Sequence, residues 1–446
     1  MQNKNTLSYV ALISIHLVIG FAIFVMPFLA KVYAFLIIVV GILILLKSRN
    51  TNNEALFLAA YLVGAEVLLR MKDGVLLYEF GKYGVMFFLF IGMLYQGFSK
   101  GSFIYWFFIV ILLPGVFYSF FTLSSDTNIR KAILFNISGP LTLAISAIYC
   151  FNRKIVLKDL NNVILATGLP MLSVLVYLFL YTPSIKEVVT GTGSNFATSG
   201  GFGPNQMSTV LGLATFIFMS RVVLESSNKK FLIINLLLTF FLAYRGIITF
   251  SRGGMMTAFA MIIGLMVVLY LKTSGKGKVK LGLIFGVVLG LIFSVWLYSS
   301  LQTGGLIDKR YANQDAIGRQ KKDRLGGREE VSGAELQMFF DNPILGIGVG
   351  KNKEIKEELL GKTVASHSEI SRMLAEHGLL GIIGLLILIL TPIILGFNNK
   401  QHIYLYSFLF FWFLTINHAA MRIAAPGFIY ALSLLKVSFE DDTIHR

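Results

Sequence analysis

The chain has 446 residues and a formal net charge of +16 at pH 7; 56% of its residues are hydrophobic and only 14% are charged. With a mean hydropathy of +0.74 this composition excludes an ordinary soluble protein, because no water-soluble core needs so many apolar residues. The Lys and Arg residues form short clusters between apolar runs instead of one basic domain, which follows the positive-inside rule and argues against a nucleic-acid partner.

Fourteen apolar runs predict an all-α polytopic membrane protein with about 12–14 transmembrane helices, since a hydrocarbon layer about 30 Å thick needs about 20 apolar residues per helix. The predicted number of transmembrane helices falls to twelve or thirteen if the short runs 32–46 and 403–415 do not cross the membrane. The first run is longer than the apolar part of a signal peptide and lacks a small-residue cleavage site, so we expect a retained helix. The runs are 7–29, 32–46, 54–69, 83–98, 103–121, 132–151, 160–181, 204–220, 231–249, 254–271, 279–299, 376–397, 403–415 and 420–437.

The orientation follows from the basic residues in the short connections. With the amino terminus inside, one side receives most of the Lys and Arg residues, including four lysines in the segment 272–280, and the other side receives fewer. Both termini are therefore expected in the cytoplasm. Three segments are expected on the opposite side: 182–203, 251–254 and the long connection 300–375.

The long connection 300–375 has a different composition from the rest of the chain, with twelve Lys or Arg and eleven Asp or Glu residues. Its residues 329–341 have helical spacing that Asn342-Pro343 ends, and 354–360 forms a second helical stretch. We therefore expect a small polar domain. The chain divides into the membrane helices 1–190, a second set of membrane helices 191–299, the loop domain 300–375, and the last helices with a tail, 376–446.

Two arginines near the end of the ninth run are candidates for chemistry. Arg245 lies within the run, seven residues before Arg252 of Ser251-Arg252-Gly253-Gly254, so that the two are two helical turns apart and can share a face. A charge at membrane depth costs a few kcal/mol on insertion scales and normally has a partner or a ligand. Arg245 therefore either contacts a ligand or pairs within the bundle.

Four further candidates lie in or near the loop domain. Arg328 stands just before a predicted helix, where a planar guanidinium and a helix start both favour phosphate, although a solvated or Glu-paired arginine is the alternative. His367 stands at a membrane boundary, where an imidazole can accept a proton from a hydroxyl at neutral pH or can simply be a hydrogen-bonded interfacial residue. His418 and Arg422 lie in the last hairpin, on the same side.

Two sequence features favour a structural role. The segment 343–350 has glycine at every second position, but it lacks the preceding strand and the spacing of a dinucleotide fingerprint, so we interpret it as a tight turn. Glu66 and Arg70 are four residues apart, which favours an ion pair on one helix face. The single cysteine, Cys150, excludes an intrachain disulfide and a cysteine-based metal site.

The order of the motifs resembles the O-antigen ligase and O-antigen polymerase superfamily over about residues 195–397. The chain departs from the family pattern at Ser368, where the family often has Asn, and in having no Trp shortly after Arg328. The motifs are Gly-Pro-Asn at 203–205, Ser-Arg-Gly-Gly at 251–254, Gly-Arg at 327–328, Asn-Pro-Ile-Leu-Gly-Ile-Gly at 342–348, Ala-Ser-His-Ser at 365–368 and Glu-His-Gly-Leu-Leu-Gly at 376–381.

This resemblance implies a GT-C-like, metal-independent, inverting glycosyltransferase of the bacterial inner membrane, with its active site on the periplasmic face and no cofactor. The implied donor is a glycan linked to undecaprenyl diphosphate, and the acceptor is lipid A core, a polysaccharide or a protein. By motif position, His367, Arg328 and Arg252 are the expected catalytic residues. The expected substrate-binding residues are Arg245, Asn205, Arg372, His418 and Arg422, and no metal ligand is expected.

Two other classes of function stay open. A flippase for lipid-linked sugars also suits many membrane helices, but it would place its key charges near the bilayer midplane on broken helices. The chain has no convincing internal repeat, which disfavours the repeat-built transporters. A scaffolding subunit would need neither the histidine nor the arginines of the outer segments.

Overall fold

The computed structural model of the protein describes residues 2–226, 228–321, 327–361, 364 and 366–439. Within these residues each of the fourteen apolar runs contains a helix, although only Ala425–Leu432 of the run 420–437 is helical, and this confirms an all-α polytopic membrane protein. Ala365, which belongs to one of the motifs, lies outside the described residues. The helices are α1 (Gln2–Val25), α2 (Leu29–Ser48), α3 (Glu54–Met71), α4 (Phe80–Gln96), α5 (Phe103–Thr122), α6 (Ile129–Cys150), α7 (Leu157–Tyr181), α9 (Pro204–Leu224), α10 (Lys229–Ile247), α11 (Arg252–Lys272), α12 (Gly275–Gln302), α16 (Glu369–Asn398), α17 (Leu405–Ile416) and α18 (Ala425–Leu432).

Not every apolar helix is long enough to cross a bilayer alone. By length and composition, ten helices of the described residues qualify. The other four are α3, which carries Glu54, Glu66 and Arg70 in 18 residues, and the shorter α4, α17 and α18. An eight-residue helix such as α18 is only about 12 Å long, so neighbouring protein must surround the rest of its segment. By this criterion the number of spans is lower than the predicted 12–14.

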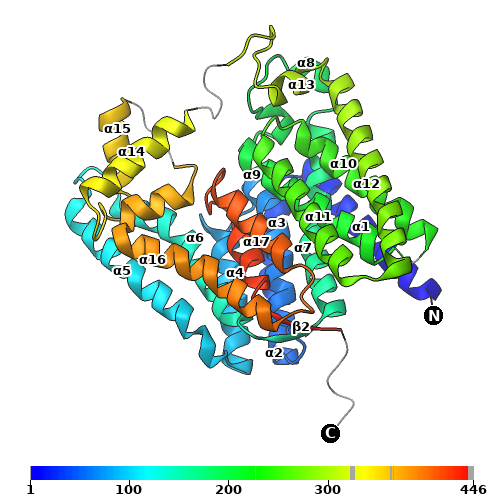
Figure 1. The fold of residues 1–446 in the computed structure, drawn as a ribbon, viewed down its shortest axis with the longest axis horizontal. Coiled ribbons are helices and arrows are strands. Elements are labelled where there is room, and N and C mark those ends of the chain that lie inside the picture. Colours follow the sequence, from blue (N-terminus) through cyan, green and yellow to red (C-terminus); the bar gives the residue numbers. More distant parts are fainter. Residues whose placement is uncertain (1, 227, 322–326, 362–363, 365, 440–446) are drawn as a thin grey trace.

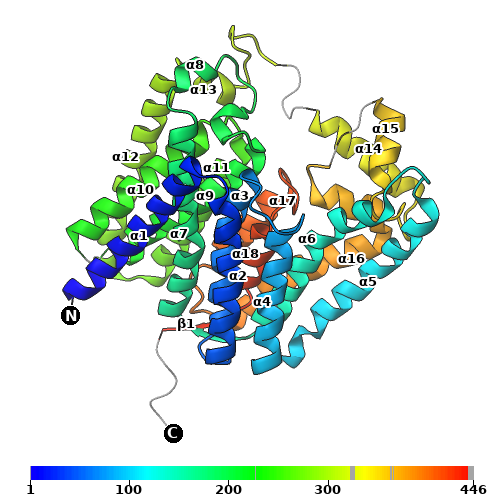
Figure 2. The same ribbon diagram turned by 180° about the vertical axis from the view of Figure 1, so that it is seen from behind.

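The polar segments gather at one edge of the bundle, which we call the loop edge (Figures 1 and 2). It holds α8 (Ile185–Val188), α13 (Leu306–Tyr311), α14 (Arg328–Asp341) and α15 (Lys351–Leu360). Of these, only α14 and the second half of α15 were predicted. Thr192 Oγ1 donates to Gln314 O (2.8 Å), which joins the predicted outer segments 182–203 and 300–375. Both segments also bind the turn just before 251–254: Asn195 N donates to Thr249 O (3.0 Å) and Arg310 Nε to Phe250 O (2.9 Å). The three segments therefore lie next to one another in the fold.

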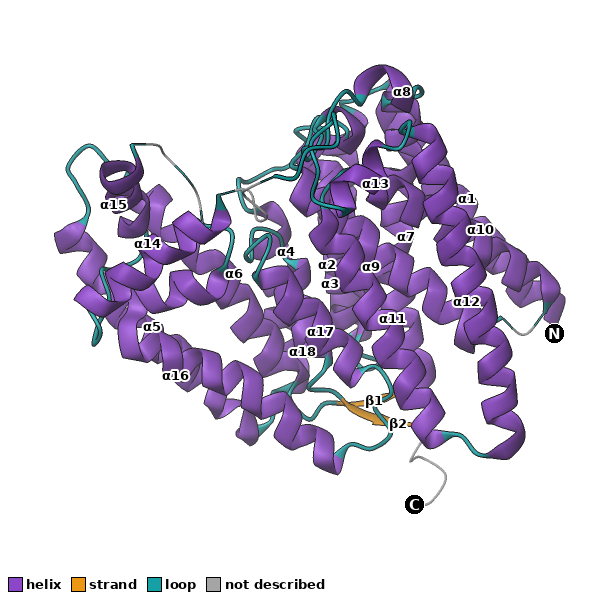
Figure 3. Ribbon diagram, turned by 45° about the horizontal axis from the view of Figure 1, so that its top comes forward, coloured by secondary structure: helices purple, strands orange, loops and turns teal. Residues whose placement is uncertain are grey.

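The opposite edge holds a two-stranded parallel sheet of β1 (Lys154–Val156) and β2 (Lys436–Ser438), as Figure 3 shows. The sheet joins the connection after α6 to the chain segment after α18. The sheet therefore places these two segments next to each other, on the same edge of the protein. Neither strand was predicted, because three residues carry no readable periodicity.

Helices α9 and α11 approach each other backbone to backbone. A Cβ atom added at Gly212 would lie 2.3 Å from Gly254 O, and one added at Gly254 would lie 2.1 Å from Ser208 O. Small residues permit such contact, which favours helix association in membranes through close van der Waals packing. The consequence is that the first turn of α9 lies directly beside the Ser-Arg motif at the start of α11.

The chain between α17 and α18, residues 417–424, is irregular and almost entirely buried in protein. Glu66 Oε2 accepts a hydrogen bond from Ala424 N (2.7 Å), and Arg70 Nη1 donates one to Arg422 O (2.8 Å). The predicted pair of Glu66 and Arg70 is confirmed at 3.5 Å. The Glu66 carboxylate and the Arg70 guanidinium thus satisfy two backbone groups of this irregular segment.

Helix α16 begins seven residues before the predicted run 376–397, so that the polar connection is shorter than expected and ends at Ser368. The helix is broken at Gly378, which has φ 58° and ψ −135°. Segment 343–350 packs into this break: Leu379 N donates to Pro343 O (2.7 Å) and Ile347 N to Ala375 O (2.9 Å). The predicted tight turn is thus confirmed, and its glycines permit close contact with α16.

We predict that Gly378→Ala destabilises the protein, whereas Gly286→Ala does not. A Cβ atom at Gly378 would meet Pro343 O at 2.6 Å in a backbone conformation that is essentially reserved for glycine, at a cost of about 1–3 kcal/mol before the clash is added. A Cβ atom at Gly286 of α12 meets nothing within 4 Å. Thermal unfolding in detergent, followed by circular dichroism, measures both; equal melting temperatures would contradict this account of the break.

Candidate functional site

The Ser-Arg motif lies at the sharp turn between α10 and α11. Phe250 has a left-handed φ of 57°, and α11 begins at Arg252. Ser251 Oγ donates to Asn205 Oδ1 (2.8 Å), and Ser208 Oγ donates to Ser251 O (2.7 Å). The beginning of α9 therefore fixes the turn that carries Arg252, and Asn205 is one of the residues that hold it.

Gly253, which follows Arg252 in this turn, lies against the imidazole of His418. A Cβ atom at Gly253 would lie 2.5 Å from the imidazole of His418, so that glycine allows the ring to pack on α11. The ring nitrogens contact Thr209 Oγ1 (3.1 Å) and Leu414 O (3.0 Å). Since both nitrogens have protein partners, His418 joins the irregular segment 417–424 to α9 and α11.

Arg245 does not share a helix face with Arg252, because α10 ends at Ile247 and the two arginines stand on different helices. The side chain of Arg245 is 1% exposed. Its guanidinium donates to Leu178 O (2.7 Å) and Thr182 O (3.3 Å) at the end of α7, and lies over the ring of Phe179. A cation at a helix carboxyl end is stabilising, so these contacts give Arg245 a structural role.

Three arginines from different parts of the sequence lie within electrostatic range of one another. Burial lowers the pKa of Arg328 and of Arg310, and the charge of Arg252 lowers both further. Arg310 also feels Arg328, and its Nε donates to Phe250 O (2.9 Å). Bringing like charges together is unfavourable unless an anion joins them. We call Arg252, Arg310 and Arg328 the arginine cluster.

Arg310 was not singled out in the sequence. It lies in Lys309-Arg310-Tyr311 at the end of α13, a few residues after α12, and basic and aromatic residues commonly flank a membrane helix. The signal that distinguishes it is spatial: the short α13 folds back over the start of α11. Burial raises the pKa of Tyr311 to about 12, against the opposing charges of Arg252 and Arg310.

His367 stands at the border of the arginine cluster. Burial lowers its pKa to about 4, and the charges of Arg422, Arg328, Lys356 and His418 act in the same direction. Its Nδ1 is buried and accepts or donates no hydrogen bond within the described residues. At neutral pH the imidazole is therefore uncharged and retains a nitrogen lone pair.

The segment 366–368 is held by the irregular chain 417–424. Arg422 Nη2 donates to Ser366 O (2.7 Å), and Ala420 N donates to His367 O (3.2 Å). Arg422 thus has a defined backbone partner in addition to its electrostatic effect on His367. Hydrogen bonds thus join the segment 366–368 to the chain around residue 420, although the two are far apart in the sequence.

Arg372 lies apart from the arginine cluster. It is buried and forms ion pairs with Glu369 and, at 2.5 Å, with Glu376 on its own helix, while its Nη2 also donates to Asn136 O (3.0 Å). Glu376 in turn accepts from Gly350 N (2.8 Å) at the start of α15. These contacts fasten α15 and α6 to α16, and the predicted substrate contact of Arg372 stays a prediction.

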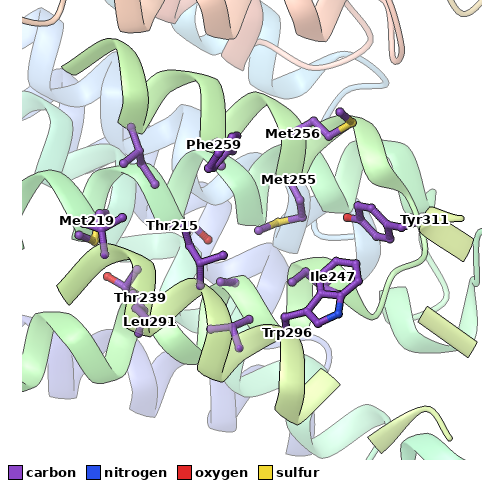
Figure 4. A pocket seen from close by; sticks show the side chains of 16 residues that line it. Thr215, Met219, Thr239, Ile247, Met255, Met256, Phe259, Leu291, Trp296 and Tyr311 are labelled. Atoms are coloured by element: carbon purple, nitrogen blue, oxygen red, sulfur yellow. The ribbon is translucent and has the colours of Figure 1, made fainter. Parts of the chain in front are cut away.

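An apolar cavity of about 280 Å³ lies between α9, α10, α11 and α12 (Figure 4). Its outer end is bordered by Met255, Trp296 and Tyr311, and the rings of the last two are 4.9 Å apart. A second apolar cavity of about 370 Å³ shares Phe259 and Ile292 with the first and continues between α11 and α12. Together they form a groove along the membrane helices that ends beside the arginine cluster, since Tyr311 follows Arg310 and Met255 lies in the first turn of α11.

Comparison with known families identifies the central part of the chain. Residues 237–386 match the family model of the O-antigen ligases. This range contains Arg252, Arg310, Arg328 and His367, while Asn205, His418 and Arg422 lie outside it. Neither the curated proteins nor the solved structures include a significant match.

Proposed function

Because the chain contains a domain of the O-antigen ligase family, we propose that it is a membrane glycosyltransferase that moves a glycan from undecaprenyl diphosphate to an acceptor hydroxyl, with inversion and without a metal. The observation that carries the proposal is the arginine cluster, with the uncharged His367 at its border, at the end of an apolar groove. We further propose that the loop edge faces the periplasm and that both termini are cytoplasmic.

The groove and the arginine cluster suit the two parts of such a donor. A polyprenyl chain is apolar, as are the side chains of Phe259, Ile292 and Met255 along the groove. The diphosphate is an anion that two or more guanidinium groups can bind through paired hydrogen bonds. In this arrangement the tail lies between α11 and α12 and the diphosphate lies among Arg252, Arg310 and Arg328.

The reaction then follows from charge. The acceptor oxygen forms a bond to the anomeric carbon while the bond from that carbon to the diphosphate oxygen breaks, and the electron pair leaves with the polyprenyl diphosphate. The three guanidinium groups stabilise the negative charge that develops on the leaving group. The lone pair of His367 takes the proton of the attacking hydroxyl, and the proton passes afterwards to solvent.

We predict that Arg310→Gln lowers kcat/KM for the donor on the order of 10²-fold, since it removes one charged donor to the leaving group. Arg319→Gln is the control, because Arg319 lies in the same loop, is 75% exposed and pairs only with Asp315 among the described residues. The measurement is glycan transfer in proteoliposomes loaded with the undecaprenyl-diphosphate-linked glycan. Movement of the donor across the bilayer without a new glycosidic bond would instead identify a flippase.

We predict that His367→Ala lowers kcat about 10²- to 10⁴-fold while donor binding stays unchanged. A base is active above its pKa, and the pKa of His367 is lowered to about 4, so its contribution to the wild-type rate is constant at neutral pH and falls as the pH drops through about 4. The pH dependence of kcat in the same proteoliposomes tests this. A wild-type rate that already halves near the ordinary pKa of histidine, about 6.5, would contradict the assignment.

We propose lipid A core as the acceptor, with a growing polysaccharide or a protein hydroxyl as the alternatives. Deletion of the gene is then expected to remove every long glycan chain from lipid A while leaving full-length chains on the polyprenyl carrier. Analysis of both lipid fractions measures this outcome. Single glycan repeats on lipid A would instead indicate a polymerase, and unchanged lipid A with glycan missing from proteins would indicate a protein acceptor.

A further inference from the structure

A fully buried ion pair contacts the residue before His367. Glu335 of α14 and Lys356 of α15 are both 0% exposed, and Lys356 Nζ lies 2.9 Å from Glu335 Oε1. Ser366 Oγ donates to the same carboxylate oxygen and accepts from Lys356 Nζ (3.0 Å). The other oxygen, Oε2, accepts from Ser371 Oγ (2.5 Å). Three donors from three separate segments thus converge on the Glu335 carboxylate.

The position of Glu335 on its helix links the two candidate catalytic groups. Arg328 is the first residue of α14, and Glu335 follows it by seven residues, which is about two helical turns. The same rigid helix therefore carries a member of the arginine cluster at one point and binds the neighbour of His367 at another. On the other side of the segment, Arg422 and Ala420 hold the backbone carbonyls of Ser366 and His367.

Stability alone is a weak reason for such a pair. The desolvation of two buried charges commonly costs as much as their attraction returns, and apolar side chains of the same volume often serve stability equally well. The apolar contact of Met338 with Ile347 and Ala375 already packs α14 against α16. A polar group whose partners are all specified instead selects one arrangement of the segments that it joins.

We propose that Glu335 and Lys356 are positioning residues: through Ser366 they fix the separation between Arg328 and His367, so that leaving-group stabilisation and proton acceptance act on the same bound donor and acceptor. The proposal rests on the glycosyl transfer proposed above. Neither residue touches the substrate in this account. Both act through the segment that carries the imidazole.

The electrostatic surroundings of His367 provide a readout that mere destabilisation would not move. The charged and titratable groups that act on the imidazole are Arg328 of α14, Lys356 of α15, and His418 and Arg422 of segment 417–424. All of them lower its pKa, in addition to burial. Loss of the Lys356 charge therefore raises the pKa of His367, and the acid limb of the pH–rate profile moves to higher pH.

Three variants of the full-length protein in nanodiscs test the proposal. Glu335→Gln/Lys356→Met removes both charges together, so that no single charge is left buried without a partner. Ser366→Ala leaves the ion pair intact and removes only its link to the His367 segment. The control is Lys351→Met/Glu354→Gln, a second ion pair at the start of α15, whose carboxylate bonds Thr127 and Ser124 instead of Ser366.

The probes are the undecaprenyl-diphosphate-linked glycan with acceptor lipid for kcat and KM, and radiolabelled undecaprenyl diphosphate for binding. We expect kcat to fall roughly 10- to 100-fold in the double variant and in Ser366→Ala, because a misplacement of about 1 Å costs up to about 10² in rate. Binding should change less than about twofold, since no arginine of the cluster is altered. Ser366→Ala keeps both charges, so its acid limb should stay in place. The double variant also removes the Glu335 carboxylate, whose effect on the pKa of His367 opposes that of Lys356, so a shift of the acid limb in that variant is the difference between the two effects.

The outcomes separate this inference from the function on which it rests. A wild-type protein that forms no glycosidic bond refutes the proposed function. A wild-type protein that transfers glycan, together with a Ser366→Ala variant of unchanged kcat, refutes the positioning role even if the double variant fails to fold. Equal losses of kcat in the control and in Ser366→Ala would also refute it, because they would indicate a general effect of altering the loop domain.

Discussion

Irregular backbone at membrane depth is stable only where protein surrounds it and satisfies its polar groups, and the candidate site depends on this requirement. Residues 417–424 form an irregular segment that is largely buried in protein. Glu66 and Arg70 of α3 form hydrogen bonds with the backbone of this segment. Arg422 of the same segment donates a hydrogen bond to Ser366 O. Glu66 and Arg70, which the sequence predicts to form an ion pair, thus help to keep a non-helical chain in place, and Ala420 of that chain donates a hydrogen bond to His367 O.

The arginines of the outer half fall into two groups according to their partners. Arg245 and Arg372 are enclosed by carbonyl and carboxylate oxygens of the protein itself, which leaves them little capacity for a ligand. In the second group, the charge of Arg252 lowers the pKa of Arg310 and of Arg328, and the charge of Arg328 also lowers the pKa of Arg310. An anion that binds to the second group would relieve this repulsion.

Much of the fold can be predicted from the sequence. The thickness of the hydrocarbon layer sets the length of apolar runs, so the fourteen runs can be recognised, and the loop helix α14 can be recognised from its helical spacing. Three features cannot be predicted from the local sequence, because each depends on a distant partner: the early start of α16, its break at Gly378 and the small sheet. The same limit applies to the candidate site. Motif order points to Arg252, Arg328 and His367, but α13 must fold back before Arg310 joins them, and the partners of Arg245 become known only from packing.

The pairing of β1 with β2 constrains the order of assembly. Strand β1 leaves the ribosome directly after α6, while β2 leaves only after α18. Helix α18, which packs against α6 and α17, immediately precedes β2. The contacts of α6 with α18 and of β1 with β2 therefore form only after the helices between them have been translated.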